Sequence, residues 1–252
     1  MRSGKTRLIM AALVAIVAII SYFGKRSLNP ITGEQQYVSL SPEQEIALGN
    51  QSAPEMAGQF GGLSTDEALQ RKVREIGNRI VSQTDAVRSP YEFHFSVLAD
   101  DKTVNAFALP GGNVFITEGL ADRLTSDDQL AGVLGHEIGH VIGRHSAEQM
   151  AQMELTQGLI SAGQIATNDP NMISSYVGQM INLKFGRDDE LESDKFGVNY
   201  MHQAGYTPRA MIEVMEILQQ ASGNSSQPEF QSTHPSPANR IQHIKDEIAA
   251  LQ

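Results

Sequence analysis

The chain has 252 residues, no cysteine and a formal net charge of −10. Its length suits one sizeable catalytic domain, and the lack of cysteine excludes thiol nucleophiles, disulfides, cysteine zinc sites and a lipid-bearing cysteine. Five basic residues precede residue 27, so 14 basic and 29 acidic residues remain after it, a net charge of −15 that argues against nucleic acid as a partner.

The first 40 residues predict a membrane segment followed by a linker. A basic N-terminus (1–7) precedes the uncharged apolar run Leu8–Phe23, which is typical of a membrane anchor or a signal peptide. No small-x-small cleavage site follows, which favours the uncleaved anchor. Charge around the run puts the N-terminus in the cytoplasm and the domain on the periplasmic, extracytoplasmic side; a soluble periplasmic form after cleavage is the alternative. Residues 24–40 are expected to be a linker.

Capping patterns and apolar periodicity predict the elements of the rest of the chain. Ser41-Pro42 begins one helix, and Ser64 with Glu67 has the capping-box spacing that begins another. Residues 91–97 alternate as in a half-buried strand, and residues 104–117 predict two strand segments around a Pro-Gly-Gly turn. Later helices are expected after Ser126, at 151–166, 172–184 and 188–203, from Thr207 to about Ala221, and after Ser236.

The helix after Ser126 contains the sequence HEIGH. On an α-helix His136 and His140 lie about 40° apart and one turn along the axis, so both imidazoles can reach one metal ion. Glu137 lies beside that ion without binding it. This spacing is the zinc-peptidase signature. An amphipathic helix with two solvated histidines is the alternative, and a third ligand decides between the two, because catalytic zinc needs three protein ligands and an open position.

The residues alone offer two candidates for the third zinc ligand. The pattern HExxHxxGxxH fails, because Ser146 stands where its last histidine belongs, and His145 on a continuing helix lies about 180° from His136. The other possibility is a glutamate from a later helix, with an acid one turn beyond it to hold a histidine in place. Glu190 and Asp194 have that spacing. Glu192 points elsewhere on the same helix.

Four segments occur in an order that resembles one known family. These are VNAFALPGGNVFITEGL, HEIGHVIGRH, ELESD and STHPSPANRI, and together they resemble the M48 family of membrane-linked zinc endopeptidases over roughly residues 41–252, the expected metallopeptidase domain. The chain is most similar to the short bacterial members with a single N-terminal membrane signal. The resemblance implies a mainly helical α+β fold of the zincin-like (gluzincin) type, with a small sheet beside the HExxH helix. It also implies one zinc ion per chain, held by His136, His140 and Glu190.

The expected mechanism assigns a role to further residues. Glu137 acts as the base that takes a proton from water, and Asp194 orients a histidine. By spacing alone His234 and Arg240 would be surface or cap residues; the resemblance makes His234 an active-site donor, which either stabilises the oxyanion or occupies the open zinc position at rest. The neighbouring Pro235 favours the first role, because it stiffens the chain.

The strand segment Val104–Leu109 is expected to pair with an extended substrate backbone. Asn105, Ala106 and Phe107 are therefore candidate substrate contacts, with Arg240 as a further one. The expected partners are unfolded or extended polypeptides, and the membrane through residues 8–23.

The predicted function is that of a zinc-dependent endopeptidase in envelope protein quality control. The sequence also leaves two alternative functions open. One is a non-catalytic zinc-bound, chaperone-like binding module, against which an intact Glu137 argues. The other is a metal-free, membrane-tethered helical protein.

Overall fold

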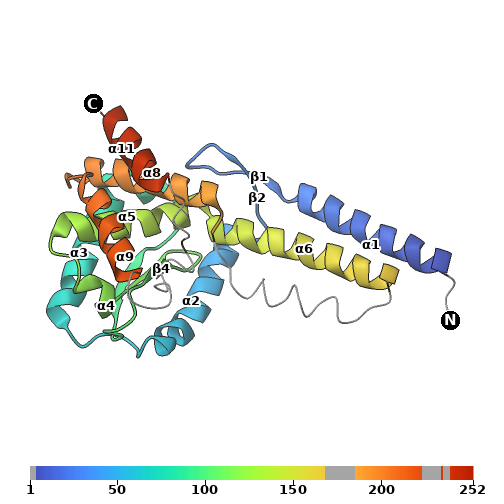
Figure 1. Cartoon of the computed structure of the whole chain (residues 1–252), viewed down its shortest axis with the longest axis horizontal. Coiled ribbons are helices and arrows are strands. Elements are labelled where there is room, and N and C mark those ends of the chain that lie inside the picture. Colours follow the sequence, from blue (N-terminus) through green and yellow to red (C-terminus); the bar gives the residue numbers. More distant parts are fainter. Residues whose placement is uncertain (1–3, 168–184, 223–233, 235–238, 252) are drawn as a thin grey trace. The chain divides into compact units, whose positions relative to one another are not determined.

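The computed structural model describes residues 4–167, 185–222, 234 and 239–251 (Figure 1). The predicted helix at 172–184 lies outside the described residues. In chain order the elements are α1 (Gly4–Gly24), β1 (Arg26–Leu28), β2 (Gln35–Tyr37), α2 (Pro42–Gln59), α3 (Glu67–Gln83), the 3-10 helix η1 (Asp85–Arg88), β3 (His94–Leu98), β4 (Ala106–Ala108), β5 (Asn113–Thr117), α4 (Glu118–Ala121), α5 (Asp127–Gly143), α6 (His145–Thr167), α8 (Arg187–Gln203), α9 (Ala210–Ser222) and α11 (Arg240–Ala250).

Contacts between residues divide the chain into two units. One comprises residues 1–39 and 147–183, and the other comprises residues 40–146 and 184–252. Of the described residues, 147–167 thus group with the N-terminal segment, and the expected extent of the metallopeptidase domain, residues 41–252, stays a prediction. Among the described helices, α1 alone is long and apolar enough to cross a membrane, as its uncharged run predicts.

A small hairpin occupies much of the expected linker. β1 and β2 pair antiparallel, with Arg26 opposite Tyr37. The turn between them is built locally, because the Asn29 side-chain oxygen accepts hydrogen bonds from the backbone N–H groups of Ile31 (2.9 Å) and Thr32 (3.2 Å). Asparagine supplies a turn in this way without help from the rest of the fold, so residues 24–40 are more ordered than their Pro and Gly content suggests.

The second unit begins with two capped helices, α2 and α3. Ser41 and Gln44 form the predicted capping box of α2. At α3 the prediction is wrong in detail, because the N-cap is Asp66 and not Ser64. The Asp66 side chain accepts hydrogen bonds from the backbone N–H groups of Ala68 and Leu69. The Ser64 hydroxyl instead accepts from Asp66 N and donates to Glu118. Asp66 lies two residues later, where its negative charge also interacts favourably with the positive, N-terminal end of the helix dipole.

Three strands form the sheet in the order β3-β5-β4. β3 runs parallel to β5, with Phe95 opposite Val114, and β4 runs antiparallel to β5. The predicted strand alternation is confirmed, since Phe95 and Val97 are buried and His94 is exposed. The Pro-Gly-Gly turn links β4 to β5 at positive φ, as only glycine readily allows: Gly111 has φ 84°, and a Cβ there would lie 2.4 Å from the Ile46 Cα.

Helix α5 is the centre of the second unit, and every residue from its third position onward is buried. It packs against α8 at close range, because Gly135 and Gly139 leave no side chain between the two backbones. A Cβ on Gly139 would lie 3.1 Å from the Ser193 Cα, and one on Gly135 would lie 3.2 Å from the Gly197 Cα. This close approach sets side chains of α8 directly beside the HEIGH residues of α5.

The α5 helix ends at Gly143, followed by Arg144 in the left-handed conformation with φ 60°. Its guanidinium Nε lies 3.3 Å from the buried Glu45 carboxylate, and its Nη2 donates to the Leu40 carbonyl (2.7 Å). These contacts offset the cost of a non-glycine residue at positive φ. The helix therefore breaks before His145, contrary to the continuing helix assumed from the sequence.

Candidate active site

Two histidines of α5 point their rings at one place. His136 and His140 are both buried, and their Nε2 atoms lie 3.1 Å apart. The helical spacing predicted this, because residues four apart lie on the same face. Both rings present the same type of nitrogen, which is the arrangement needed to share one ion.

Glu190 of α8 completes a triangle with these two nitrogens. Its carboxylate is fully buried; Oε2 lies 3.6 Å from His136 Nε2, and Oε1 lies 3.5 Å from His140 Nε2. For zinc ligands at about 2.0–2.1 Å and tetrahedral angles, neighbouring donor atoms are about 3.3 Å apart. The three observed separations bracket that value, so the donor set fits a zinc ion in both chemistry and spacing.

Each histidine also contacts a group behind its ring. His136 Nδ1 lies 3.0 Å from Asp194 Oδ1, as the spacing of Glu190 and Asp194 predicted. His140 Nδ1 lies 2.9 Å from His145 Nδ1, and His145 Nε2 lies 3.0 Å from Glu192 Oε2. A neutral His140 that keeps its Nε2 lone pair for a metal donates from Nδ1, and His145 can accept only if its own proton is on Nε2, facing the carboxylate.

The contacts of His145 and Glu192 could not be read from the sequence. His145 reaches the ring of His140 because the chain reverses at Arg144. Glu192 was thought to point away from the site, and it contacts the site only through His145. No periodicity within one helix signals a contact that depends on a break between two helices.

Arg240 lies at the carboxylates and is 1% exposed. Its Nε and Nη2 donate to Asp194 at 2.7 and 2.6 Å, and its Nη1 lies 2.7 Å from Glu190 Oε2. From the sequence Arg240 is expected to contact substrate, and that stays a prediction. In the structure its guanidinium faces two buried carboxylates, and a forked contact of this kind can hold Glu190 and Asp194 in position.

Glu137 is a fully buried carboxylate beside this cluster. Within the described part of the chain neither of its oxygens has a hydrogen-bond partner, and the nearest ionisable nitrogen is His234 Nε2 at 3.8 Å. Burial is the main reason that the pKa of Glu137 is raised above its ordinary value, although the nearby histidines oppose the shift. An unpartnered buried carboxylate is costly, and a raised pKa suits proton transfer near neutral pH.

His234 belongs to the same cluster although it is 44 residues from Glu190 in sequence. It is 1% exposed, its Nδ1 lies 2.9 Å from Glu190 Oε1, and its ring centroid is 4.8 Å from that of His140. His136, His140, Glu190 and His234 each offer one donor atom, and all four atoms lie within 4.8 Å of one another. Spacing alone gave His234 no role; the resemblance did.

Charge in the cluster is arranged so that the donors keep the protonation states a metal requires. Burial lowers the pKa of His140 well below its ordinary value, which leaves the ring neutral. Burial would raise the pKa of Glu190, but the neighbouring His234, whose Nδ1 lies 2.9 Å from Glu190 Oε1, holds that pKa well below the usual range. Asp194 behaves likewise, with burial outweighed by Arg240, so its pKa is also lowered.

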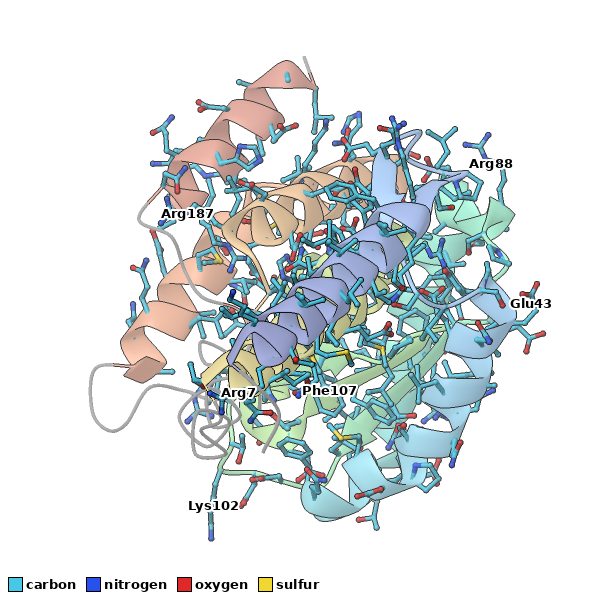
Figure 2. The ribbon with its side chains drawn as sticks, turned by 90° about the vertical axis from the view of Figure 1, so that its right-hand side faces the viewer. Arg7, Glu43, Arg88, Lys102, Phe107 and Arg187 are labelled. Atoms are coloured by element: carbon cyan, nitrogen blue, oxygen red, sulfur yellow. The ribbon has the colours of Figure 1, made fainter. Side chains whose placement is uncertain are left out.

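The candidate substrate strand lies at the edge of the sheet. Among the described residues β4 pairs only with β5, and it contacts α5. Ala106 is fully buried, and Asn105 is 2% exposed with its N–H bonded to Thr117 Oγ1. The ring of Phe107, labelled in Figure 2, packs against Phe60 and Phe115 at centroid distances of 5.4 and 5.2 Å. Side chains of this strand thus pack in the core, and the expected substrate contacts at Asn105, Ala106 and Phe107 stay a prediction.

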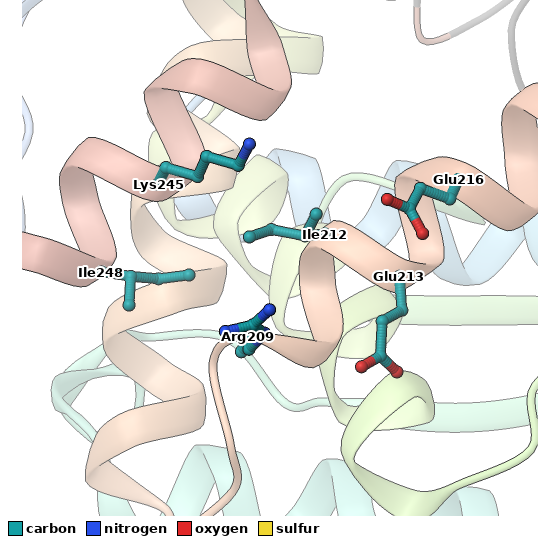
Figure 3. A pocket seen from close by; sticks show the side chains of 6 residues that line it. All are labelled: Arg209, Ile212, Glu213, Glu216, Lys245 and Ile248. Carbon is teal, nitrogen blue, oxygen red and sulfur yellow. The ribbon is translucent and has the colours of Figure 1, made fainter.

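A separate pocket of about 510 Å³ lies between α9 and α11 (Figure 3). Ile212 and Glu213 of α9 face Lys245 and Ile248 of α11 across it. It contains none of the four clustered donors, so it is not the catalytic site.

Comparison with known proteins gives a consistent result. The profile described as Peptidase family M48 matches residues 67–248. The chain is 30% identical to the beta-barrel assembly-enhancing protease of Yersinia pestis, over 88% of this chain and 47% of that protein. It is 28% identical to the mitochondrial metalloendopeptidase OMA1 of Schizosaccharomyces pombe, over 100% of this chain and 74% of that protein.

A shorter relative matches over most of both lengths. The chain is 28% identical to the metalloprotease YcaL of Escherichia coli K12, over 84% of this chain and 83% of that protein. The chain spans about half the length of the beta-barrel assembly-enhancing proteases that it matches.

Proposed function

The chain belongs to peptidase family M48 and is a zinc metallopeptidase, and from this premise we propose that His136, His140 and Glu190 hold the zinc ion while Glu137 transfers the protons of peptide hydrolysis. The observation that carries the assignment is the convergence of the three donor groups: the two histidine Nε2 atoms lie 3.1 Å apart, and each lies 3.5–3.6 Å from one oxygen of Glu190. Their spacing suits tetrahedral zinc and all three are buried, so solvated histidines on a helix do not account for it.

Zinc, when bound, supplies Lewis acidity that acidifies water and polarises a peptide carbonyl. Glu137 is the base: one carboxylate oxygen accepts a proton from the attacking water and later gives a proton to the nitrogen of the leaving amine. One water is consumed, the C–N bond breaks, and the products are a carboxylate end and an amine end. Burial keeps bulk water from the carboxylate, and its raised pKa brings it closer to that of the groups it exchanges protons with.

Three neighbouring groups hold the donors in position. Asp194 fixes the ring of His136, and the pair of His145 and Glu192 fixes the ring of His140. Arg240 fixes the carboxylates of Glu190 and Asp194. Partners of this kind set ring orientation and ligand basicity. Their role is to position the donors, since none of them reaches the point on which the three donors converge.

The geometry of His234 favours one of its two possible roles. Its donor atom lies within the same 4.8 Å cluster as the three proposed ligands, and its ring is held by Glu190. A fourth donor at that distance suits occupation of the open zinc position at rest better than a donor reserved for the oxyanion. Substrate would then have to displace His234.

The substrate is an extended polypeptide that pairs with the outer edge of β4. Edge strands offer unpaired N–H and C=O groups, and pairing through the backbone gives loose sequence preference. The name of the Yersinia relative refers to enhancement of β-barrel assembly, which supports unfolded or misassembled envelope proteins as substrates. The apolar helix α1 would anchor the enzyme, with its catalytic domain on the extracytoplasmic side.

Casein digestion by the full-length protein, with and without a zinc chelator, tests this proposal. Glu137→Gln should keep near-normal zinc and lose at least about 100-fold in rate, which is the scale of a general base. The wild-type protein should lose activity with chelator and regain it with added zinc. An active Glu137→Gln enzyme would overturn the mechanism, and a zinc-loaded wild-type protein that binds casein without cutting it would identify a binding module instead.

A further inference from the structure

Helices α1 and α6 lie side by side (Figure 1), with contacts near Ala18 and at the C-terminal end of α1. A Cβ placed on Gly158 of α6 would lie 2.5 Å from the Cβ of Ala18. Near the C-terminal end of α1, Lys25 forms an ion pair with Glu154. The chain directions are antiparallel, because Lys25 meets Glu154 while the earlier Ala18 meets the later Gly158. The covered residues of α1 recur at helical spacing: Arg7, Ala11, Val14, Ala15, Ala18 and Tyr22.

The other face of α1 is apolar and exposed. Leu8, Ile9, Val17 and Ile20 have 60–66% of their surface exposed, as expected of side chains that face lipid in a membrane-inserted helix. A helix that enters the bilayer with α6 attached along its opposite face carries α6 with it. The part of α6 that lies inside the bilayer must then be free of charged residues that lack a partner.

In residues 147–167 of α6, the charged residues lie only near the C-terminal end of α1. Both acidic residues, Glu148 and Glu154, contact the segment around that end: Glu154 pairs with Lys25, and Glu148 accepts from the Tyr37 backbone N–H (3.2 Å). From Leu155 to Thr167 there is no charged residue. Lys25 follows the apolar run directly, so this ion pair marks the expected membrane surface.

The hydroxyl groups of this uncharged part are satisfied within the helix. Thr156 donates to the Gln152 carbonyl, Ser161 to the Gln157 carbonyl and Thr167 to the Gly163 carbonyl, at 2.8–2.9 Å. Bonds to the carbonyl four residues earlier let a hydroxyl avoid water, and they suit helices in lipid. The contact with α1 uses small residues, Ala18 and Gly158, which permit close helix packing without a hydrophobic driving force.

We propose that Leu155–Thr167 of α6 enters the membrane beside α1, so that the bilayer contacts two helices of this protein and not one. The 13 residues extend about 20 Å, which is less than a hydrocarbon core of about 30 Å, so the segment enters without crossing. Gln157 lies within one turn of the surface pair, and Leu159, 42% exposed, points to lipid. The inference rests on the proposed anchoring by α1, and its ligand is the lipid bilayer.

The absence of cysteine allows single-cysteine probes in the full-length protein. Val17→Cys reports the anchor, Leu159→Cys reports the proposed lipid face of α6, and Gln152→Cys, exposed on the same helix before Glu154, is the matched control. Each variant is labelled with an environment-sensitive fluorophore and reconstituted in liposomes of phosphatidylcholine and phosphatidylglycerol. Zinc content shows that each variant has folded.

Quenching by lipids that carry a nitroxide on the acyl chain gives the result. We expect the labels at Val17 and Leu159 to lose most of their fluorescence and the label at Gln152 to lose little, with the reverse order for aqueous iodide. If Val17 is quenched by the lipid and Leu159 responds like Gln152, α1 is an anchor and α6 stays in water, which overturns the inference alone. If Val17 is not quenched either, the proposed anchoring fails together with it.

Discussion

Replacing Arg240 by methionine removes the only arginine that pairs with Glu190 and Asp194 among the described residues, at nearly constant side-chain length. Both carboxylates are fully buried and the guanidinium is 1% exposed, and the three shortest contacts are 2.6–2.7 Å. Removing one partner of such a buried pair costs about 3–5 kcal/mol, because a charge is left without compensation. We expect a loss of this size in the free energy of unfolding of the zinc-free protein.

The loss should be smaller with zinc bound, because the ion compensates Glu190 and only Asp194 is left without its cation. Arg240→Lys is the control: it keeps the charge but cannot contact both carboxylates in the same forked geometry, so an intermediate loss is expected. Urea unfolding of the zinc-free and zinc-loaded forms measures these differences. If the zinc-free Arg240→Met protein unfolds within about 0.5 kcal/mol of the wild type, a surface-like effect, and the zinc-loaded variant shows only a raised KM, then Arg240 contacts substrate and the positioning role is wrong.

For the same variant the direction of the pH dependence of the free energy of unfolding can also be predicted. Arg240 outweighs burial and lowers the pKa of Asp194 in the folded protein, so this group stabilises the fold above the unfolded value of about 3.9 and the contribution is lost as pH falls below it. Without Arg240, only the contact with His136 still opposes burial, so the folded pKa of Asp194 rises. Unfolding of zinc-free Arg240→Met should therefore become less favourable, relative to the wild type, as pH falls from 6 towards 4.

Three further outcomes follow from the same contacts. Glu190→Ala should lose zinc after dialysis while His145→Ala keeps it with weaker affinity, about 10 to 100-fold, and full zinc occupancy in Glu190→Ala would refute the ligand set. His234→Ala should retain zinc and raise kcat on a short fluorogenic peptide, because a resting donor no longer competes with substrate; a fall of about 100-fold in turnover would instead identify an oxyanion donor. Gly139→Val should destabilise the protein by about 1–3 kcal/mol through overpacking, as followed by thermal unfolding, whereas Gly58→Val, which meets no atom within 4 Å, should not show this loss.

Much of the site could be predicted from the sequence because its key residues are close together within single helices. A period of 3.6 residues puts His136 beside His140, and Glu190 beside Asp194, whatever the rest of the fold does. The alternation of residues 91–97 and the glycine turn before Asn113 were equally local, and both were confirmed. The role of His234 came from resemblance, because no periodic pattern links it to α5.

Only the tertiary structure decided which groups hold those residues in place. Arg240 meets Asp194 from 46 positions away, and Glu192 reaches the site through His145 because the chain turns back at Arg144. Local spacing fixes which face of its own helix a side chain occupies, but the atoms it meets depend on how two helices pack and where one ends. The glycines of α5 bring α8 close enough for the carboxylates of one helix to reach the histidines of the other, and that separation is a property of the packed fold.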